Sequence, residues 1–359
     1  MQIFDYMEKY GYEELVMYTD KEVGLRAFVC IHDTTLGPAV GGTRMWPFAT
    51  EEEALRDVLR LAKAMTYKSS LAGLDMGGGK ALIIGDPNED KTEALFRAHG
   101  RFIDTLGGRF ITTEDVGIVV DDIVNMRKET RYASGLPESQ GGLGGAEVIT
   151  GYGIYRGAQA CCKELFGSDS LGDRTVAIQG FGKVAYSLAE YLKKDGAKII
   201  TADINETRVA MAVEMGATVV GPEEIYDVEC DIFSPCALGG VLNSDTIPRI
   251  KAPIVAGAAN NQLLEDAHAE ELKKAGILYA PDYAINPGGI ITVACELGAY
   301  GRDAAMGMTG KVYDTLLNVF ALAKAEGITT AAAADHLAEE RISNARKIKN
   351  IYRGNNQQT

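Results

Sequence analysis

The chain of 359 residues is 46% hydrophobic and 24% charged, a composition typical of about two globular domains with sizeable cores. Its net charge of −14 argues against nucleic acids and anionic membranes as partners, because both attract basic surfaces. No apolar run reaches the roughly 18 residues of a transmembrane helix, and the N-terminus lacks a basic-then-apolar signal pattern. We therefore expect a cytoplasmic protein.

Cysteine and histidine are few and scattered along the chain. The six cysteines form no CxxC pair, and the four histidines form no HExxH motif. The sequence therefore predicts reduced thiols and no metal site.

Residues 1–133 predict a mixed α/β domain. Thr50 with Glu53 forms a capping box that opens a helix of apolar spacing. Residues 38–45 contain Gly41-Gly42 and are too rich in glycine for the centre of a plain strand, which suggests that a ligand approaches the backbone. The other expected helices are 2–9, 90–107 and 121–128, and the expected strands are 14–18, 25–31, 81–84 and 109–112.

Three charged side chains in this domain occupy positions that suit a site. Lys68 lies at the C-terminal end of the capped helix, where its positive charge could simply interact favourably with the helix dipole. Lys80 follows three glycines at the start of a strand, backed by flexible backbone, in a segment that is not a P-loop. Asp115 follows the carboxyl end of a strand, where α/β proteins usually bind their ligands. The pattern alone is equally compatible with solvated surface groups.

The glycine-rich segment 134–145 predicts a domain boundary able to absorb a hinge motion. We expect a dinucleotide-binding domain at 134–329 and a C-terminal helix, 330–359, that packs back on the first domain. That second domain reads as a parallel doubly wound sheet, because short apolar strands alternate with helical segments. Its later expected elements are strands at 217–220, 231–234, 253–256 and 277–280, and helices at 150–166, 303–326 and 330–351, the last capped by Thr330.

Residues 175–203 carry the most specific local motif. A strand leads into GxGxxA, formed by Gly180, Gly182 and Ala185, and a helix and second strand end at Asp203. The glycines permit a tight turn and close approach to a pyrophosphate, which the helix N-terminus attracts. Asp203 lies 23 residues after Gly180 (203 − 180), a spacing typical of the acid that binds the adenosine ribose. An ordinary βαβ turn is the alternative, but the full strand–turn–helix–strand–acid context favours a dinucleotide site.

Seven segments in order resemble one known family: HDTTLGPAVGGTRMW, MTYK, GLDMGGGKALIIGDP, TTEDVG, DIFSPCALGG, AGAANNQL and APDYAINPGGII. They are similar to the glutamate/leucine/phenylalanine/valine dehydrogenases, most of all the leucine branch, over nearly the whole chain. The resemblance implies a substrate and oligomerisation domain, a Rossmann domain that binds NAD, and a cleft between them. It also implies a homo-oligomer, an octamer in this family.

The resemblance assigns roles to single residues. Lys80 becomes the general acid/base lysine and Asp115 the second proton-transfer group, while Lys68 and the Gly41-Gly42 backbone bind the amino-acid carboxylate. A lysine base near neutral pH requires desolvation or a neighbouring cation. The other implied substrate residues are Met65, Val40, Thr113, Asn261, Ile290 and Val293. The implied NAD residues are Gly180, Phe181, Gly182, Lys183, Val184, Ala185, Asp203, Ile204, Thr150, Cys236, Ala237, Ala258 and Asn260.

The implied side-chain pocket is uncharged, because it consists of Val40, Thr113, Ile290 and Val293. A second substrate carboxylate would lie unpaired against Val40, which disfavours glutamate. We therefore predict NAD-dependent, reversible oxidative deamination of branched-chain L-amino acids (leucine, valine and isoleucine) to 2-oxo acids and ammonia. Three residues depart from the family pattern: Glu147, which brings a negative charge near the expected nicotinamide, Pro287 and Cys295.

Three alternatives stay open. The first is an aromatic amino acid dehydrogenase of the same family, acting on phenylalanine or tryptophan. The second is a 2-hydroxy-acid dehydrogenase, which usually requires a histidine–acid pair that has no counterpart at these strand ends. The third is a catalytically idle dinucleotide-binding regulator, although such a protein needs neither Lys68 nor Lys80.

Overall fold

The computed structural model describes residues 2–348, and the chain divides into two compact units. Unit 1 comprises Met1–Gly142 and His336–Thr359, and unit 2 comprises Leu143–Asp335. The division falls inside the glycine-rich segment 134–145, later than the expected boundary after residue 133. Within residues 2–348, no helix combines the length and apolar character needed to cross a bilayer.

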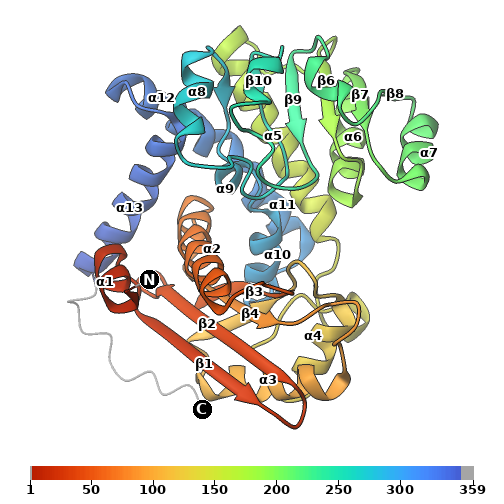
Figure 1. Ribbon diagram of the computed structural model, residues 1–359. Helices are drawn as coiled ribbons and strands as arrows, with labels where there is room; N and C mark the ends of the chain where they lie inside the picture. Colours follow the sequence, from red (N-terminus) through yellow and green to blue (C-terminus); the bar gives the residue numbers. More distant parts are fainter. Residues whose placement is uncertain (1, 349–359) are drawn as a thin grey trace. The chain divides into compact units, whose positions relative to one another are not determined.

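Unit 1 is built on a five-stranded sheet in the order β1-β2-β4-β3-β5. The three strands β1, β2 and β4 pair antiparallel, while β3 runs parallel to β4 and β5. Helix α2 covers one face of this sheet, and α3 and α4 cover the other (Figure 1). The strands are β1 (Glu14–Asp20), β2 (Leu25–Asp33), β3 (Ala39–Trp46), β4 (Gly77–Ile84) and β5 (Phe110–Thr113), and the helices are α1 (Ile3–Tyr10), α2 (Glu51–Leu71), α3 (Glu93–Thr105) and α4 (Val120–Arg127).

The glycines of unit 1 lie in strands, which corrects two expectations. The segment thought too glycine-rich for a strand centre is β3, between β4 and β5, and the three glycines before Lys80 open β4 instead of forming flexible backbone. The reason is close packing. A Cβ at Gly41 would lie 1.8 Å from the Gly79 carbonyl oxygen, and one at Gly78 would lie 2.0 Å from the Thr66 nitrogen of α2.

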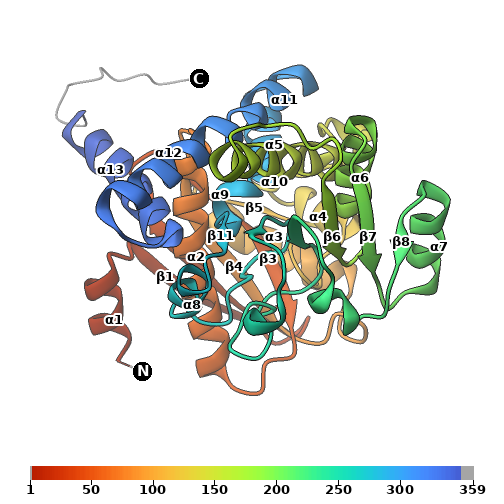
Figure 2. The ribbon, with the colours of Figure 1, turned by 90° about the horizontal axis from the view of Figure 1, so that it is seen from above.

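Unit 2 contains a six-stranded parallel sheet in the order β11-β10-β9-β6-β7-β8, which confirms the doubly wound prediction. The strand order reverses between β6 and β9, so these neighbours form the switch point at which α/β proteins bind ligands. Figure 2 shows α5 and α6 beside β6 and β7. The strands are β6 (Thr175–Gln179), β7 (Lys198–Ala202), β8 (Thr218–Val219), β9 (Ile232–Pro235), β10 (Ile254–Val255) and β11 (Leu278–Tyr279).

The helices of unit 2 differ from expectation at three places. α5 (Ala146–Phe166) begins four residues before Thr150, because Gly145 in the left-handed conformation sets its start. The helix expected at 303–326 is two, separated at Lys311. The remaining helices are α6 (Lys183–Asp195), α7 (Glu206–Met215), α8 (His268–Lys274), α9 (Asp282–Ile285), α10 (Gly288–Leu297), α11 (Arg302–Gly310) and α12 (Val312–Glu326). The last helix, α13 (Thr330–Ile348), begins in unit 2 and belongs to unit 1 from His336 onward.

The third difference concerns the cap of α13. The Thr329 hydroxyl oxygen accepts a hydrogen bond from the Ala332 nitrogen at 3.1 Å, so Thr329 is the cap. Thr330 instead donates to the Tyr279 carbonyl oxygen at 2.7 Å. The last predicted residues of this helix, 349–351, lie outside the described residues.

Residues 336–348 of α13 contact the rest of unit 1. The Arg341 guanidinium donates to the Leu74 carbonyl oxygen at 2.7 Å and to Asp75 Oδ1 at 3.0 Å. Ser70 donates to the Ala338 carbonyl oxygen at 2.9 Å. These contacts hold the C-terminal turn of α2 and the segment that leads into β4.

Candidate active site

A cluster of four charged side chains lies on the α2 face of the unit 1 sheet. Lys80 Nζ is 2.9 Å from Asp115 Oδ2, and only 5% of the lysine side chain is exposed. Arg44 Nε donates to the same carboxylate oxygen at 2.8 Å. A terminal nitrogen of Arg44 donates to Asp57 Oδ2 of α2 at 2.9 Å. The cluster thus joins β3, β4, the loop after β5, and α2.

Strand alternation explains why these side chains meet. Residues two apart in a strand share a face. On β4, Lys80 shares its face with Leu82, which packs into the core against α2, whereas Ala81 belongs to the core on the opposite face. On β3, Arg44 shares a face with Gly42. A Cβ at Gly42 would lie 2.7 Å from Asp115 Cβ, so only glycine lets the Asp115 loop pass this strand.

Burial and charge set the proton affinities of the cluster. Burial lowers the pKa of Lys80, the Asp115 carboxylate opposes that effect, and the Arg44 charge adds to it. Burial raises the pKa of Asp115, but the adjacent Lys80 and Arg44 outweigh it and hold that pKa below its ordinary value. The result is an ionised carboxylate beside an amine that loses its proton more readily than an exposed lysine. This combination suits a general base.

The other substrate residues predicted in unit 1 surround this end of the sheet. Gly42 and Thr113 are register partners on β3 and β5, and Val40 is fully buried opposite Ile111. Met65 and Lys68 are half-buried and lie three residues apart on α2, so they point to the same side of the helix. The structure thus groups these residues by element, while their roles in binding stay predictions.

Unit 2 holds the dinucleotide motif at the carboxyl end of β6. Gly180 has φ of +86°, and a Cβ there would lie 2.7 Å from the Ala237 Cβ. The Asp203 carboxylate, with 4% of its side chain exposed, accepts a hydrogen bond from the Phe181 nitrogen at 2.6 Å. Its other oxygen accepts from the Asn205 nitrogen at 2.8 Å. The acid therefore fixes the glycine turn.

The start of α6 fits the phosphates of a dinucleotide. A Cβ added at Gly182 would meet no heavy atom within 4 Å, so the backbone borders open space. No side chain caps the N-terminus of α6 at this position. Its backbone N–H groups and positive dipole end can therefore receive a pyrophosphate. Lys183 is exposed, Val184 is half-buried, and Ala185 is buried against the sheet.

The remaining predicted cofactor residues follow the ends of β7, β9 and β10, at the same edge of the sheet. Ile204 is 90% exposed directly after Asp203, and Cys236 follows β9. Ala258 and Asn260 follow β10, and the Asn286 amide donates to the Ala258 carbonyl oxygen and to Asn260 Oδ1, both at 2.9 Å. The buried Asn286 amide therefore holds this loop.

The last predicted residues lie on α5, α10 and the loop before them. Thr150 is inside α5, and a Cβ at Gly288 would lie 2.4 Å from the Thr150 Cα, so α10 starts against α5. Asn261 adopts φ of +52°, and Ile290 and Val293 are buried on α10. These residues belong to unit 2, whereas the charged cluster belongs to unit 1.

The three departures from the family pattern have local physical explanations. Glu147 lies in the first turn of α5, where the helix dipole stabilises a negative charge. Pro287 precedes the first residue of α10, a position that proline tolerates because its missing N–H is not needed there. Cys295 is buried, with its sulfur 3.7 Å from the Met308 sulfur.

Sequence reasoning missed Arg44 and Asp57. Arg44 belongs to residues 38–45, whose glycine content argues against the centre of a strand, and Asp57 is one of many acids on an amphipathic helix. The available signal was the two-residue spacing of Gly42 and Arg44, which places both on one face once β3 is a strand. Among residues 2–348, no group of three or more histidine, cysteine and acidic side chains could hold a metal ion.

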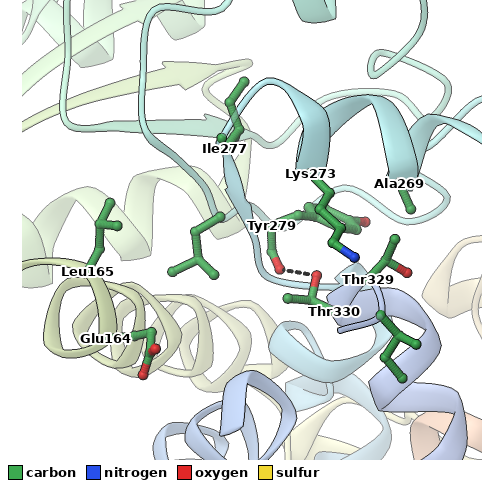
Figure 3. Close-up of a pocket in the computed structure, with 11 residues that line it drawn as sticks. Glu164, Leu165, Ala269, Lys273, Ile277, Tyr279, Thr329 and Thr330 are labelled. Carbon is green, nitrogen blue, oxygen red and sulfur yellow. Dashed lines mark hydrogen bonds between the residues drawn. The ribbon is translucent and has the colours of Figure 1, made fainter. Parts of the chain in front are cut away.

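A separate hollow in unit 2 shares no lining residue with either set of predicted residues (Figure 3). It is bordered by the C-terminal end of α5, the residues that lead into β11, and the start of α13. The segment that leads into a parallel strand lies at the amino edge of the sheet, opposite the glycine turn. Its lining includes Glu164, Lys273, Tyr279, Thr329 and Thr330, none of which is a predicted site residue.

Comparisons with known proteins cover nearly the whole chain. A model of the Glu/Leu/Phe/Val dehydrogenase dimerisation domain matches residues 13–132, and a glutamate/leucine/phenylalanine/valine dehydrogenase model matches 141–207 and 202–349. Leucine dehydrogenase of Thermoactinomyces intermedius is 55% identical over 98% of this chain and 96% of its own. Phenylalanine dehydrogenase of Bacillus thermotolerans is 46% identical over 99% and 94%, respectively. The crystal structure of L-tryptophan dehydrogenase from Nostoc punctiforme superposes with a TM-score of 0.84 at 44% identity, covering 96% of this chain and 99% of that chain.

Proposed function

Since the chain belongs to the glutamate/leucine/phenylalanine/valine dehydrogenase family, we propose that it catalyses the reversible, NAD-dependent oxidative deamination of branched-chain L-amino acids. The products are the 2-oxo acid, ammonia and NADH. The observation that carries the proposal is the buried Lys80–Asp115 pair, 2.9 Å apart, in a chain 55% identical to a leucine dehydrogenase. A buried amine of lowered pKa is what the hydrolytic half of this reaction requires.

The proposed chemistry uses the two protein groups in sequence. Lys68 and the Gly41-Gly42 backbone bind the substrate carboxylate. When bound, NAD supplies the oxidant that takes a hydride from the α-carbon of the amino acid, which leaves an iminium. Lys80 then removes a proton from the water that attacks the iminium carbon. The ionised Asp115 carboxylate relays that proton to the nitrogen, and Lys80, neutral again, takes up the hydroxyl proton as the carbonyl of the 2-oxo acid forms and ammonia departs.

The choice of NAD over NADP rests on Asp203. Both of its oxygens accept backbone hydrogen bonds, which fix the carboxylate beside the turn. A carboxylate at this position binds the ribose hydroxyls of NAD and repels a 2′-phosphate. Arg208 lies 3.6 Å from the same carboxylate and is half-exposed, so its charge is partly compensated there.

We propose the preferred side chain from the four residues that the family resemblance assigns to its pocket. Val40 and Thr113 are β-branched, and with Ile290 and Val293 they offer no charge to a substrate. Branched aliphatic side chains match such a pocket, whereas glutamate would bury an unpaired carboxylate. An aromatic amino acid is the second candidate, because phenylalanine and tryptophan dehydrogenases are 46% and 44% identical to this chain.

We further propose a cytoplasmic homo-oligomer, with an octamer as the expected form. The match of residues 13–132 to a dimerisation domain supports association through unit 1. The negative net charge of −14 gives no support for nucleic-acid partners.

A panel of L-amino acids with NAD and with NADP, followed by the absorbance of the reduced cofactor, tests the proposal. Leucine, valine and isoleucine should react and glutamate should not. The reverse reaction of the branched 2-oxo acids should depend on ammonia. Reduction of the 2-oxo acid without ammonia would instead identify a hydroxy-acid dehydrogenase.

A further inference from the structure

We propose that Arg44 is a positioning residue of the deamination site: its guanidinium fixes the Asp115 carboxylate against Lys80 and is itself anchored to α2 by Asp57. The inference deepens the proposed function and rests on it for the role of Lys80 as the base.

The geometry of Arg44 suits this task. Its Nε donates to Asp115 Oδ2 at 2.8 Å and a terminal nitrogen donates to Asp57 Oδ2 at 2.9 Å. The arginine side chain is 17% exposed, and the two carboxylates are 16% and 15% exposed. A planar guanidinium can hold two carboxylates in fixed directions, which a lysine ammonium cannot do. The orientation of Asp115 is therefore set from β3 and α2.

The shared oxygen makes the arrangement more than a structural ion pair. Arg44 and Lys80 both meet Asp115 Oδ2, at 2.8 and 2.9 Å. The buried cluster holds two cations and two anions, Asp57 included, so its net charge is zero. The exposed Arg60 lies outside the buried cluster, 3.9 Å from Asp57. Without Arg44, one amine would face two carboxylates and would be held more firmly as an ammonium.

The groups around Lys80 act on its pKa in opposing directions. Asp115 and Asp57 raise the pKa of Lys80, Arg44 lowers it, and burial lowers it most. Across β2, the register partner of Lys80 is Cys30, whose thiol stays neutral because burial raises its pKa. Lys68 stands further along α2, the helix that covers this face. Removing the Arg44 charge therefore leaves the two carboxylates unopposed by a second cation within the cluster and favours protonated Lys80.

The first test is the pH dependence of kcat/KM for leucine in Arg44→Met, Arg44→Lys and the wild type. The base must be neutral to act, so Arg44→Met should displace the acidic limb of the profile to higher pH. At neutral pH we expect a loss of roughly 10²-fold, from the displaced limb and the misplaced carboxylate together, and the part due to the displaced limb should be recovered as the pH rises. Arg44→Lys should keep the position of the limb, because the charge remains, and should lose part of kcat.

Arg26→Met is the matched control. Arg26 also joins a strand of this sheet to α2, through Glu51 at 2.7 Å, but both side chains are more than half exposed. This variant should keep the wild-type profile. The proposal would be overturned if the pH profile of kcat/KM in Arg44→Met were unshifted, including the case in which kcat/KM falls by the same factor at every pH. It would also be overturned if Arg44→Lys displaced the acidic limb as far as Arg44→Met.

Two further measurements keep the test decisive. If Arg44→Met does not fold, Asp57→Asn removes the anchor in an isosteric side chain and should lower kcat with little change in KM; an unchanged kcat overturns the positioning role. The rate at which pyridoxal 5′-phosphate and borohydride label Lys80, read by peptide mass spectrometry against pH, needs no turnover. If the wild type is inactive on every amino acid, the proposed function is wrong. If Arg44→Lys, Asp57→Asn and Arg44→Met give equal labelling profiles, only the inference about Arg44 is wrong.

Discussion

The charged cluster of unit 1 and the glycine turn of unit 2 are built in opposite ways. The cluster joins residues distant in the chain, since Arg44 and Asp115 are 71 residues apart, and it acts through side-chain charge. The turn spans 22 residues between Phe181 and Asp203 and acts mainly through backbone N–H groups. The first depends on packing between elements, and the second on local chain conformation.

Lys80→Ala should produce the largest effect of the variants considered, and it should affect turnover without affecting cofactor binding. Loss of an acid/base group typically costs about 10²–10⁴ in rate, so kcat should fall by that factor. NADH binding should persist, because the turn of unit 2 is untouched. Steady-state kinetics and NADH fluorescence titration measure the two quantities. Lys68→Ala is the comparison variant and should chiefly raise the amino-acid KM. Near-normal turnover of Lys80→Ala would show that another group is the base.

Replacing one glycine in each unit by alanine should affect protein stability in unit 1 and NADH affinity in unit 2. In Gly41→Ala the new Cβ would lie 1.8 Å from the Gly79 carbonyl oxygen, so β3 and β4 must separate. Overpacking of this kind costs about 1–3 kcal/mol or more, which thermal unfolding should register. In Gly182→Ala the Cβ meets nothing within 4 Å, so stability should hold while NADH affinity falls. Equal unfolding temperatures for Gly41→Ala and wild type would contradict the packing account.

These two glycines also show what the sequence can and cannot predict. The motif around Gly182 is local, so the strand, turn, helix and Asp203 were all predicted from spacing. The sequence suggests that Gly41 lets the backbone approach a ligand closely, but the group that lies close to it is the Gly79 carbonyl across the sheet, and no spacing along the chain encodes that distance. Arg44 was overlooked for the same reason, because its partners come from α2 and from the loop after β5.

Substitutions at the predicted side-chain pocket of unit 1 should change which amino acid is preferred without changing the reaction. Val40 is fully buried and Thr113 ends β5, so Val40→Gly combined with Thr113→Gly should enlarge the side-chain pocket. A hydrophobic pocket discriminates by about 1–3 kcal/mol per methylene, or roughly 10–200-fold. We expect kcat/KM for phenylalanine relative to leucine to rise within that range. A wild type that already prefers phenylalanine or tryptophan would refute the pocket assignment and favour the aromatic alternative.

Asp203→Asn should give the smallest effect, and it tests whether the turn of unit 2 depends on charge as well as conformation. The two aspartate oxygens accept from the Phe181 and Asn205 nitrogens, at 2.6 and 2.8 Å. An asparagine can accept only one of these bonds, and its amide nitrogen would face an N–H donor. A hydrogen bond to a charged group contributes about 1.5–3 kcal/mol and one between neutral groups about 0.5–1.5, so the difference predicts a several-fold loss of NAD affinity. The ratio of kcat/KM for NAD to that for NADP should fall as well, because the charge that repels a 2′-phosphate is gone while Arg208 remains 3.6 Å from this position. Arg208→Ala in the same background should restore part of the preference for NAD. An unchanged ratio in Asp203→Asn would mean that the shape of the turn, and not the carboxylate, selects the cofactor.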